Sequence, residues 1–116
     1  YETQLAEFDT ALAALKQALQ RWPQGCYALW YPIKRRRELH GFFRSAARLQ
    51  AASVLCAELL VHADDSPLRL NGSGMLVVNP PWQLDDLLAP ALPALRHFIG
   101  EPGASWRLEW VRPAAG

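Results

Sequence analysis

Apolar residues recur along the chain with two different spacings, one helical and one extended. From Leu5 to Trp22 the large apolar side chains lie three and four positions apart, which predicts an amphipathic helix over 4–22. The same spacing predicts helices over 34–51 and 84–99. Pro90 and Pro93 fall inside the last segment, so we expect them to kink it or split it into two short helices.

Short apolar runs between these helices predict strands. The runs have no polar alternation, which is typical of strands buried on both faces, and they cover 26–31, 54–61 and 75–79. Pro32 is expected to end the first run. A final strand is predicted around Trp106 and Trp110, where apolar and charged residues alternate.

The order of these elements predicts an α/β fold. Helices that alternate with fully buried strands favour a mostly parallel sheet covered on both faces, and the segment 26–61 forms one complete βαβ unit. No helical pattern separates the strands at 54–61 and 75–79, so we expect those two to be antiparallel. A mostly parallel sheet with an antiparallel strand near one edge corresponds to half of a doubly wound fold.

Composition adds limits but names no partner. The 116 residues are 51% hydrophobic and 20% charged, which indicates one small folded domain without a membrane-spanning segment. The formal net charge is only +1. Cys26 and Cys56 both lie in apolar runs, so we interpret them as buried thiols of a protein from a reducing, cytoplasmic compartment.

Most familiar catalytic and binding motifs are missing from the sequence. No glycine-rich loop joins a strand to a helix, and Gly72-Ser73-Gly74, which precedes a strand, is interpreted as a turn. The three histidines are scattered, so no metal site is expected. Glu58 is a carboxylate inside an apolar strand. We favour a paired glutamate at a sheet edge or end over a catalytic acid.

Positive charge gathers in the predicted second helix. Between Tyr31 and Gln50 six basic residues accompany one acidic residue, a local excess of +5. Such a surface suits a phosphate backbone, although an ordinary solvated helix face is an equal alternative on charge alone. The candidate residues for binding a nucleic-acid backbone are Lys34, Arg35, Arg36, Arg37, Arg44 and Arg48.

One short string has the composition of a catalytic turn. Asn79-Pro80-Pro81-Trp82 follows a predicted strand. Methyltransferases that act on the amino groups of nucleobases carry an Asp, Asn or Ser followed by two prolines and an aromatic residue at the end of a strand. The side-chain oxygen and a proline carbonyl accept the hydrogens of the amine, and the aromatic ring stacks on a base turned out of its helix. Two prolines can also simply end a strand, so the residues alone leave both interpretations open.

Several blocks together resemble one family over the whole length of the chain. They are Ala28-Leu29-Trp30-Tyr31-Pro32, Ala57-Glu58-Leu59-Leu60-Val61, and Gly72-Ser73-Gly74-Met75 leading into Asn79-Pro80-Pro81-Trp82. In this order they are similar to the carboxyl-terminal part of the RlmJ family of bacterial ribosomal RNA methyltransferases. The resemblance implies a class I, Rossmann-like fold. It also implies transfer of a methyl group from S-adenosylmethionine to the exocyclic nitrogen of one adenine in 23S rRNA.

The resemblance also gives a meaning to the first residues. In that family a catalytic Asp-Pro-Pro-Tyr turn is followed by Glu and an amphipathic helix, and Tyr1-Glu2 matches the tail of that turn. Tyr1 would then be the base-stacking catalytic residue, and the half that binds the cofactor would precede it. We therefore expect a partial domain that is inactive alone, holds no S-adenosylmethionine, and can self-associate through its exposed sheet edge.

On this interpretation Asn79–Trp82 is a second copy of the pattern that shapes the wall beside the base pocket. Trp30, Tyr31 and Pro32 would line the same pocket, with core packing as an equal alternative. Two rival functions remain open: a non-catalytic Rossmann-like binding or structural module, and a DNA adenine methyltransferase or a protein for the use of external DNA as a nutrient.

Overall fold

The computed structural model describes residues 2–63 and 70–112, with side chains from Glu7 onward. Its elements follow the predicted order. They are α1 (Glu2–Arg21), β1 (Tyr27–Ile33), the 3-10 helix η1 (Arg36–Leu39), α2 (His40–Ala46), β2 (Val54–Leu60), β3 (Gly72–Val78), α3 (Leu84–Ile99) and β4 (Ser105–Arg112). Within the described ranges no helix is long and apolar enough to cross a membrane.

The four strands form one sheet in the order β1-β3-β2-β4, and every neighbouring pair is antiparallel. The expectation of a mostly parallel sheet is therefore wrong for these strands, whereas the antiparallel pairing of β2 with β3 is confirmed. Because β1 and β2 both run opposite to β3, they run in the same direction, as a βαβ unit requires, with β3 inserted between them. β1 is the edge strand on one side of this sheet.

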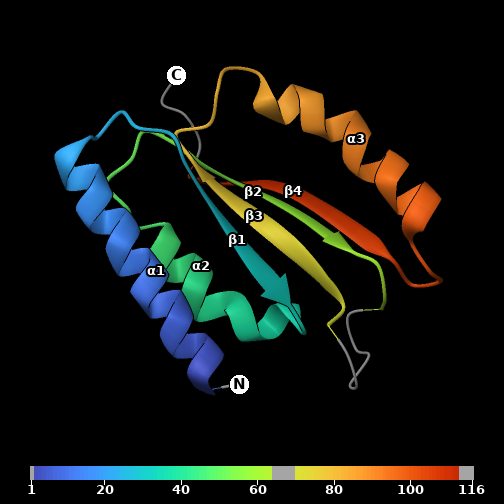
Figure 1. Ribbon diagram of the computed structural model, residues 1–116. Helices are drawn as coiled ribbons and strands as arrows, with labels where there is room; N and C mark the ends of the chain where they lie inside the picture. Colours follow the sequence, from blue (N-terminus) through green and yellow to red (C-terminus); the bar gives the residue numbers. More distant parts are fainter. Residues whose placement is uncertain (1, 64–69, 113–116) are drawn as a thin grey trace.

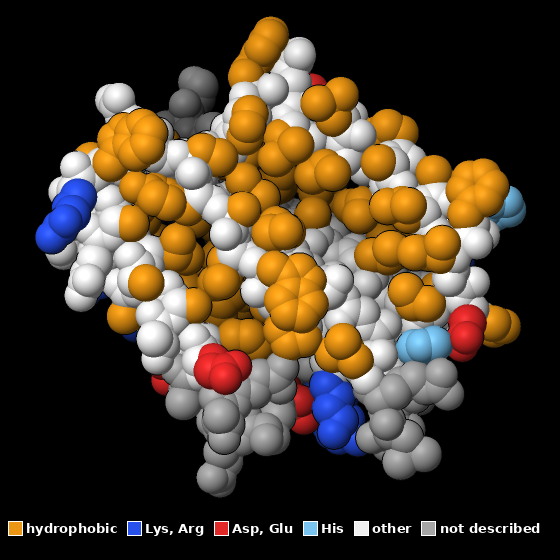
Figure 2. Space-filling model, in the orientation of Figure 1, with side chains coloured by type: hydrophobic (Ala, Val, Ile, Leu, Met, Phe, Trp, Pro, Cys, Tyr) orange, Lys and Arg blue, Asp and Glu red, His pale blue; other side chains and the backbone are white. Residues whose placement is uncertain are grey.

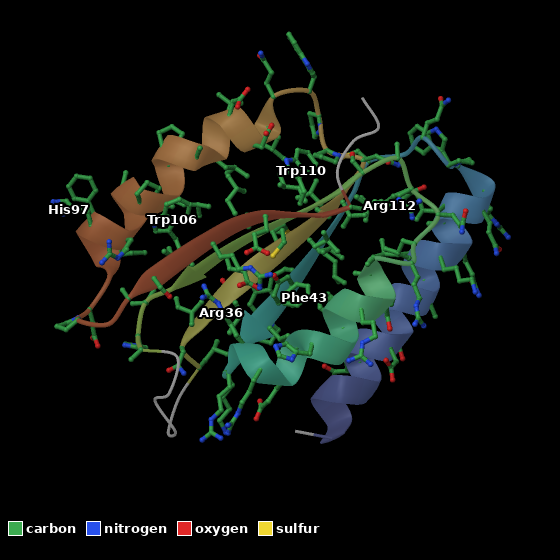
Figure 3. The ribbon with its side chains drawn as sticks, turned by 180° about the vertical axis from the view of Figure 1, so that it is seen from behind. Arg36, Phe43, His97, Trp106, Trp110 and Arg112 are labelled. Atoms are coloured by element: carbon green, nitrogen blue, oxygen red, sulfur yellow. The ribbon has the colours of Figure 1, made fainter. Side chains whose placement is uncertain are left out.

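Helices cover both faces of the sheet (Figure 1). Phe8, Leu12, Leu15 and Leu19 of α1 pack with α2 and with the inward residues of β1, β2 and β3, and together they form the main core. On the opposite face α3 packs over β2 and β4. Trp106 and Trp110 project from β4 toward α3 (Figure 3). The final strand and its alternation are thus confirmed.

The second helix is much shorter than its apolar spacing predicts. The backbone is still extended at Arg35, with φ −142° and ψ 129°, and the α-helical part covers only His40–Ala46. Two tertiary contacts are the cause: the Lys34 carbonyl accepts a hydrogen bond from Asn71, and the Arg36 side chain turns inward to Glu58. These contacts hold the backbone away from helical geometry until η1 begins.

Four smaller expectations are also corrected. Gly72-Ser73-Gly74 is not a turn but the first part of β3. Pro32 does not end β1, because an edge strand tolerates a residue without an N–H group and β1 continues to Ile33. Pro90 and Pro93 lie inside a single helix, so they do not split α3. Of the two thiols, both free, only Cys56 is buried, and Cys26 is exposed.

Candidate functional site at the carboxyl ends of β1 and β2

We call the end of the sheet where β1 and β2 finish its carboxyl end. Strand pairing brings Ile33 of β1, Gly72 of β3 and Leu60 of β2 side by side there. The basic segment Lys34–Arg37 leaves β1 at this point. The amino end of α1 lies at the same end of the molecule (Figure 1). The topology thus gathers a strand end, a cluster of cations and the start of a helix.

The three pocket candidates on β1 do not share one face of the sheet. Tyr31 is fully buried on the face covered by α1 and α2. Its ring contacts the rings of Phe42 and Phe43, with centroids 5.1 and 5.9 Å away. Trp30 points to the other face and is 56% exposed. Tyr31 is therefore a core residue, whereas Trp30, with Pro32 two residues farther along the same strand, remains accessible.

The Tyr31 hydroxyl belongs to a buried polar cluster centred on Glu58. Glu58 is fully buried on β2, and its Oε2 accepts a hydrogen bond of 2.5 Å from Tyr31. Its Oε1 accepts one of 3.1 Å from Nε of Arg36, and an Arg107 nitrogen lies 3.8 Å from the same oxygen. A carboxylate buried in this way is stable only with such partners. Glu58 is thus confirmed as a paired glutamate, but it lies on an inner strand and not at an edge.

Cys56 lies on the same face of β2, two residues before Glu58. Its sulfur is 3.0 Å from the Tyr31 hydroxyl oxygen. Burial is the main cause that raises the pKa of Cys56, to about 12. Burial is also the main cause that raises the pKa of Tyr31 above its usual 10.0, and the neighbouring Cys56 and Glu58 raise it further. Both groups are therefore neutral at physiological pH, so neither is an activated nucleophile.

Arg107 completes the cluster from β4. It hydrogen-bonds Glu109 at 2.5 Å, and its guanidinium lies 5.1 Å from the centre of the Phe43 ring. The bond to Glu109 is the main cause that raises the pKa of Arg107 and lowers that of Glu109. Figure 3 shows Arg36 and Phe43 on the same side of the sheet, beside α2. Two arginines and two glutamates thus tie η1, β2 and β4 together.

A buried asparagine fastens the backbone where β1 and β2 end. Asn71 is fully buried, and its side-chain nitrogen donates a 2.6 Å hydrogen bond to the Lys34 carbonyl. Its backbone N–H donates to Ile33, and its carbonyl accepts from the N–H groups of Val61 and His62. Asn71 therefore holds the start of the basic segment against the end of β2.

The other pocket candidates lie at the opposite end of the sheet. Val78, the last residue of β3, pairs with the first residues of β1 and β2, so Asn79-Pro80-Pro81-Trp82 follows the amino ends of those strands. A strand of seven residues spans about 20 Å. The structure therefore does not bring Asn79–Trp82 together with Trp30, Tyr31 and Pro32.

Asn79 uses its whole amide group to close that far end. Its oxygen accepts from the N–H groups of Ala52 and Ser53, at 3.0 and 3.4 Å. Its nitrogen donates to the carbonyls of Pro23 and Gly25, at 3.0 and 2.9 Å. The residue adopts a left-handed φ of 52°, which asparagine tolerates. This arrangement is a structural clamp between two loops, and Trp82 beyond it is 88% exposed.

The basic candidates form a graded set. Lys34, Arg37, Arg44 and Arg48 are exposed, and Arg35 is half-buried. Among these six candidates, Arg36 alone forms an ion pair with a buried carboxylate, that of Glu58. Arg48 lies farther along and lines, with Lys16, a shallow groove between α1 and the segment after α2. Three accessible cations therefore flank one anchored arginine at the carboxyl end of the sheet.

Residues 2–63 and 70–112 contain no group of three or more His, Cys, Asp or Glu side chains able to hold a metal ion. His40 and His97 are exposed, and His62 hydrogen-bonds Glu101 at 2.7 Å. Tyr1 lies outside the described residues.

Comparison with known proteins decides the family. The model of the family described as ribosomal RNA large subunit methyltransferase D, RlmJ, matches residues 1–112. This chain belongs to the RlmJ family. The expected resemblance is therefore confirmed.

Two curated relatives of this RlmJ-family chain are named ribosomal RNA large subunit methyltransferase J. The Haemophilus influenzae protein is 32% identical over 108 residues, and the Escherichia coli protein is 27% identical over 108 residues. These matches cover 92% of the chain but only 38% and 39% of the relatives. A crystal structure of a Legionella pneumophila protein has the same fold, with a TM-score of 0.76, 23% identity, and coverage of 89% of this chain and 38% of that one.

Proposed function

We propose that this chain is the carboxyl-terminal half of an S-adenosylmethionine-dependent methyltransferase domain. The parent enzyme transfers a methyl group to the exocyclic nitrogen of an adenine in 23S rRNA. The observation that carries the proposal is the family match over residues 1–112. The relatives named above are more than twice as long as the matched segment, so most of such an enzyme lies outside these residues.

The direction of the strands supports placing the chain in a class I, Rossmann-like sheet. β1 and β2 run in the same direction and are connected through α2, with the antiparallel β3 between them. Ligands of open α/β sheets bind beyond the carboxyl ends of the parallel strands. The basic segment Lys34–Arg37 leaves β1 at that end. We therefore assign the RNA-facing side to the carboxyl end of the sheet, with Trp30 and Pro32 as the pocket candidates from β1.

The start of the chain fits the same assignment. The amino end of α1 lies at the carboxyl end of the sheet (Figure 1). A catalytic turn placed directly before α1 would thus lie close to the basic segment. On this basis Tyr1 is the aromatic residue of that turn. We do not assign Asn79 to the candidate site, because it lies at the opposite end of the sheet and its amide is hydrogen-bonded to two loops.

The described residues do not themselves fit S-adenosylmethionine. They contain no glycine-rich turn from a strand into a helix, which is the usual cradle for such a ligand. Gly72 and Gly74 instead lie inside β3. We therefore assign binding of the cofactor to the other half of the parent enzyme.

The edge of β1 and the surface beside it support a partial domain. Trp30 and Met75 face each other across β1 and β3 on the accessible face, with exposures of 56% and 36%. β1 lies at the front of Figure 1, and Figure 2 shows apolar side chains gathered across the middle of the molecule in the same view. An apolar surface beside an open strand edge is typical of a buried interface.

Methyl-transfer assays test the enzymatic proposal. The protein encoded by the complete reading frame is incubated with tritiated S-adenosylmethionine and unmodified 23S rRNA, and in a parallel reaction with double-stranded DNA. We expect label in RNA, on the exocyclic nitrogen of one adenine, and none in DNA. Label in DNA alone, or in neither polymer, contradicts the proposal.

Light scattering tests the partial-domain proposal on the chain 1–116 alone. We expect concentration-dependent self-association, reduced by Trp30→Glu, which places a charge beside the open edge. Phe98→Glu is the matched control, because Phe98 is 79% exposed but lies near the end of α3. A chain that stays a monomer at all concentrations would contradict the open interface.

A further inference from the structure

The basic segment Lys34–Arg37 differs from an ordinary charged surface because it is fastened at two points. At its start, the Lys34 carbonyl accepts a hydrogen bond from the fully buried Asn71. Two residues later, Arg36 donates to the fully buried Glu58. Long cationic side chains and an exposed backbone lose conformational entropy when they bind. Two anchors reduce that loss before any ligand arrives.

Glu58 is itself held in one position. Tyr31 donates to its Oε2, and a nitrogen of Arg107 lies 3.8 Å from its Oε1, the oxygen that Arg36 also contacts. Space for the Tyr31 hydroxyl depends on Gly74, where a Cβ atom would lie 2.5 Å from that oxygen. The carboxylate therefore has a fixed orientation, and the direction in which Arg36 leaves η1 follows from it.

We propose that Glu58 is a positioning residue, which through Arg36 holds Lys34, Arg35 and Arg37 in an arrangement ready to bind the phosphate backbone of RNA. Glu58 does not touch the ligand. The inference rests on the proposed function, because it assumes that the basic segment faces RNA. The buried negative charge of Glu58 would then strengthen the binding of RNA by ordering the basic segment, although at long range the same charge repels the phosphates.

The direction in which one substitution changes the RNA affinity separates these two effects. Glu58→Gln makes the chain more positive by one unit, so simple charge attraction predicts equal or tighter RNA binding. The positioning proposal predicts weaker binding, because Arg36 loses its ionic partner and the segment loosens. Asp86→Asn is the matched control. It changes the charge by the same amount on an exposed residue of α3, at the opposite end of the sheet.

The magnitude follows from the number of ordered phosphate contacts. Each contact contributes a slope of about 0.7 in a plot of log affinity against log salt concentration for single strands, which corresponds to about fivefold in affinity at 0.1 M salt. If two contacts are lost, Glu58→Gln weakens binding by about 25-fold and lowers the slope by about 1.4. Asp86→Asn is expected to leave the slope unchanged and to bind as tightly as the unmodified chain or slightly more tightly.

A pair of arginine variants repeats the test without altering a buried carboxylate. Arg37→Met and Arg36→Met each remove one positive charge. Arg37→Met removes one contact and lowers the slope by about 0.7. Arg36→Met is expected to lower it by more than that, since the neighbouring cations lose their anchor. Equal effects of the two variants would mean that Arg36 acts only as one more charge.

The experiment uses the protein encoded by the complete reading frame, with residues numbered as in this chain, and a fluorescein-labelled RNA hairpin of 30 nucleotides with an unpaired adenine in its loop. Fluorescence anisotropy between 50 and 300 mM salt gives the affinity and the slope. Hydrogen exchange of the backbone amides of residues 34–39 is measured on the same samples without RNA. We expect faster exchange there in Glu58→Gln and in Arg36→Met, and unchanged exchange in Arg37→Met and Asp86→Asn.

The outcomes distinguish this inference from the proposed RNA interface. Weaker binding by Glu58→Gln together with faster exchange over 34–39 supports the positioning role. Equal or tighter binding by Glu58→Gln overturns it while the RNA interface stands. If the unmodified chain does not bind the hairpin, both fail. If Glu58→Gln does not fold, the Arg36→Met and Arg37→Met slopes decide, and equal slopes overturn the inference.

Discussion

Replacing Gly74 by alanine tests the packing beneath the candidate site. Gly74 is buried in β3 and pairs with Tyr31 on one side and Glu58 on the other. An added Cβ atom would lie 2.5 Å from the Tyr31 hydroxyl oxygen. The ring cannot turn away freely, because its hydroxyl is bonded to Glu58 and it packs against Phe42 and Phe43. Gly74→Ala must therefore displace the ring or the strand.

The cost of that displacement can be worked out from its parts. Overpacking a core by one methyl group costs about 1–3 kcal/mol, and a lost hydrogen bond to a charged group about 1.5–3 kcal/mol. The alanine recovers about 0.4–1 kcal/mol by restricting the unfolded chain. The net destabilisation is about 3 kcal/mol. For a chain of this length that lowers the melting temperature by about 12 °C.

Thermal unfolding followed by circular dichroism measures the effect, with Gly41→Ala as the control. Gly41 lies in α2, and a Cβ atom there would meet nothing within 4 Å. Alanine in a helix is more stable than glycine by about 0.5–1 kcal/mol, so Gly41→Ala should raise the melting temperature by about 2–4 °C. A Gly74→Ala protein that melts within about 3 °C of the unmodified chain would refute the packing argument.

Three further predictions concern thiols, the loop clamp and acid stability. With a disulfide reagent at pH 8, the exposed Cys26 should react in the folded chain. Burial raises the pKa of Cys56 to about 12, so Cys56 should react only after denaturation. Two reactive thiols in the folded chain would contradict this. Asn79→Ala loses four hydrogen bonds and keeps a left-handed backbone, so urea titration should show a free energy of unfolding lower by about 3 kcal/mol. A decrease under about 1 kcal/mol would mean that the clamp is dispensable. The hydrogen bond from the Arg107 guanidinium lowers the pKa of Glu109 below its usual 4.5. This pair therefore stabilises the fold above about pH 4.5, and the stabilisation disappears as the pH falls through the lowered pKa. In a plot of melting temperature against pH, Glu109→Gln should reduce the fall on the acid side, and an unchanged plot would contradict the role of the pair.

The sequence predicts the elements of this fold better than their arrangement. Periodicity locates the helices, and apolar runs locate the strands to within about three residues. It does not show that β3 lies between β1 and β2, because insertion of a strand depends on pairing across the sheet and not on local pattern. The glycines of β3 illustrate the difficulty. Gly72 and Gly74 look like a turn in the sequence, but they are needed because Tyr31 and the backbone of β2 leave no room for a Cβ atom.

The candidate site is predictable in part for the same reason. The basic segment stands out as a run of charge, and Glu58 stands out as a carboxylate in an apolar strand. That the two belong together is not visible, since Arg36 and Glu58 are 22 positions apart in the chain. Arg107 does not stand out in the sequence either, because it is one of the charged residues that alternate with apolar residues in β4. A buried carboxylate requires a cationic partner. Glu58, a carboxylate in an apolar strand, therefore indicates that an arginine or lysine from another element contacts it, although the sequence does not show which one.

Two asparagines show why composition alone misplaces function. Asn79 belongs to a string that resembles a catalytic turn, yet all its polar atoms hold loops at the amino ends of β1 and β2. Asn71 belongs to no motif, yet it fixes the backbone from which the basic segment leaves. The two residues bracket β3 and close opposite ends of the same sheet. Since ligands of open α/β sheets approach the carboxyl ends of parallel strands, the end that Asn71 closes is the one where substitutions should change RNA binding. Substitutions at the Asn79 end should change only stability.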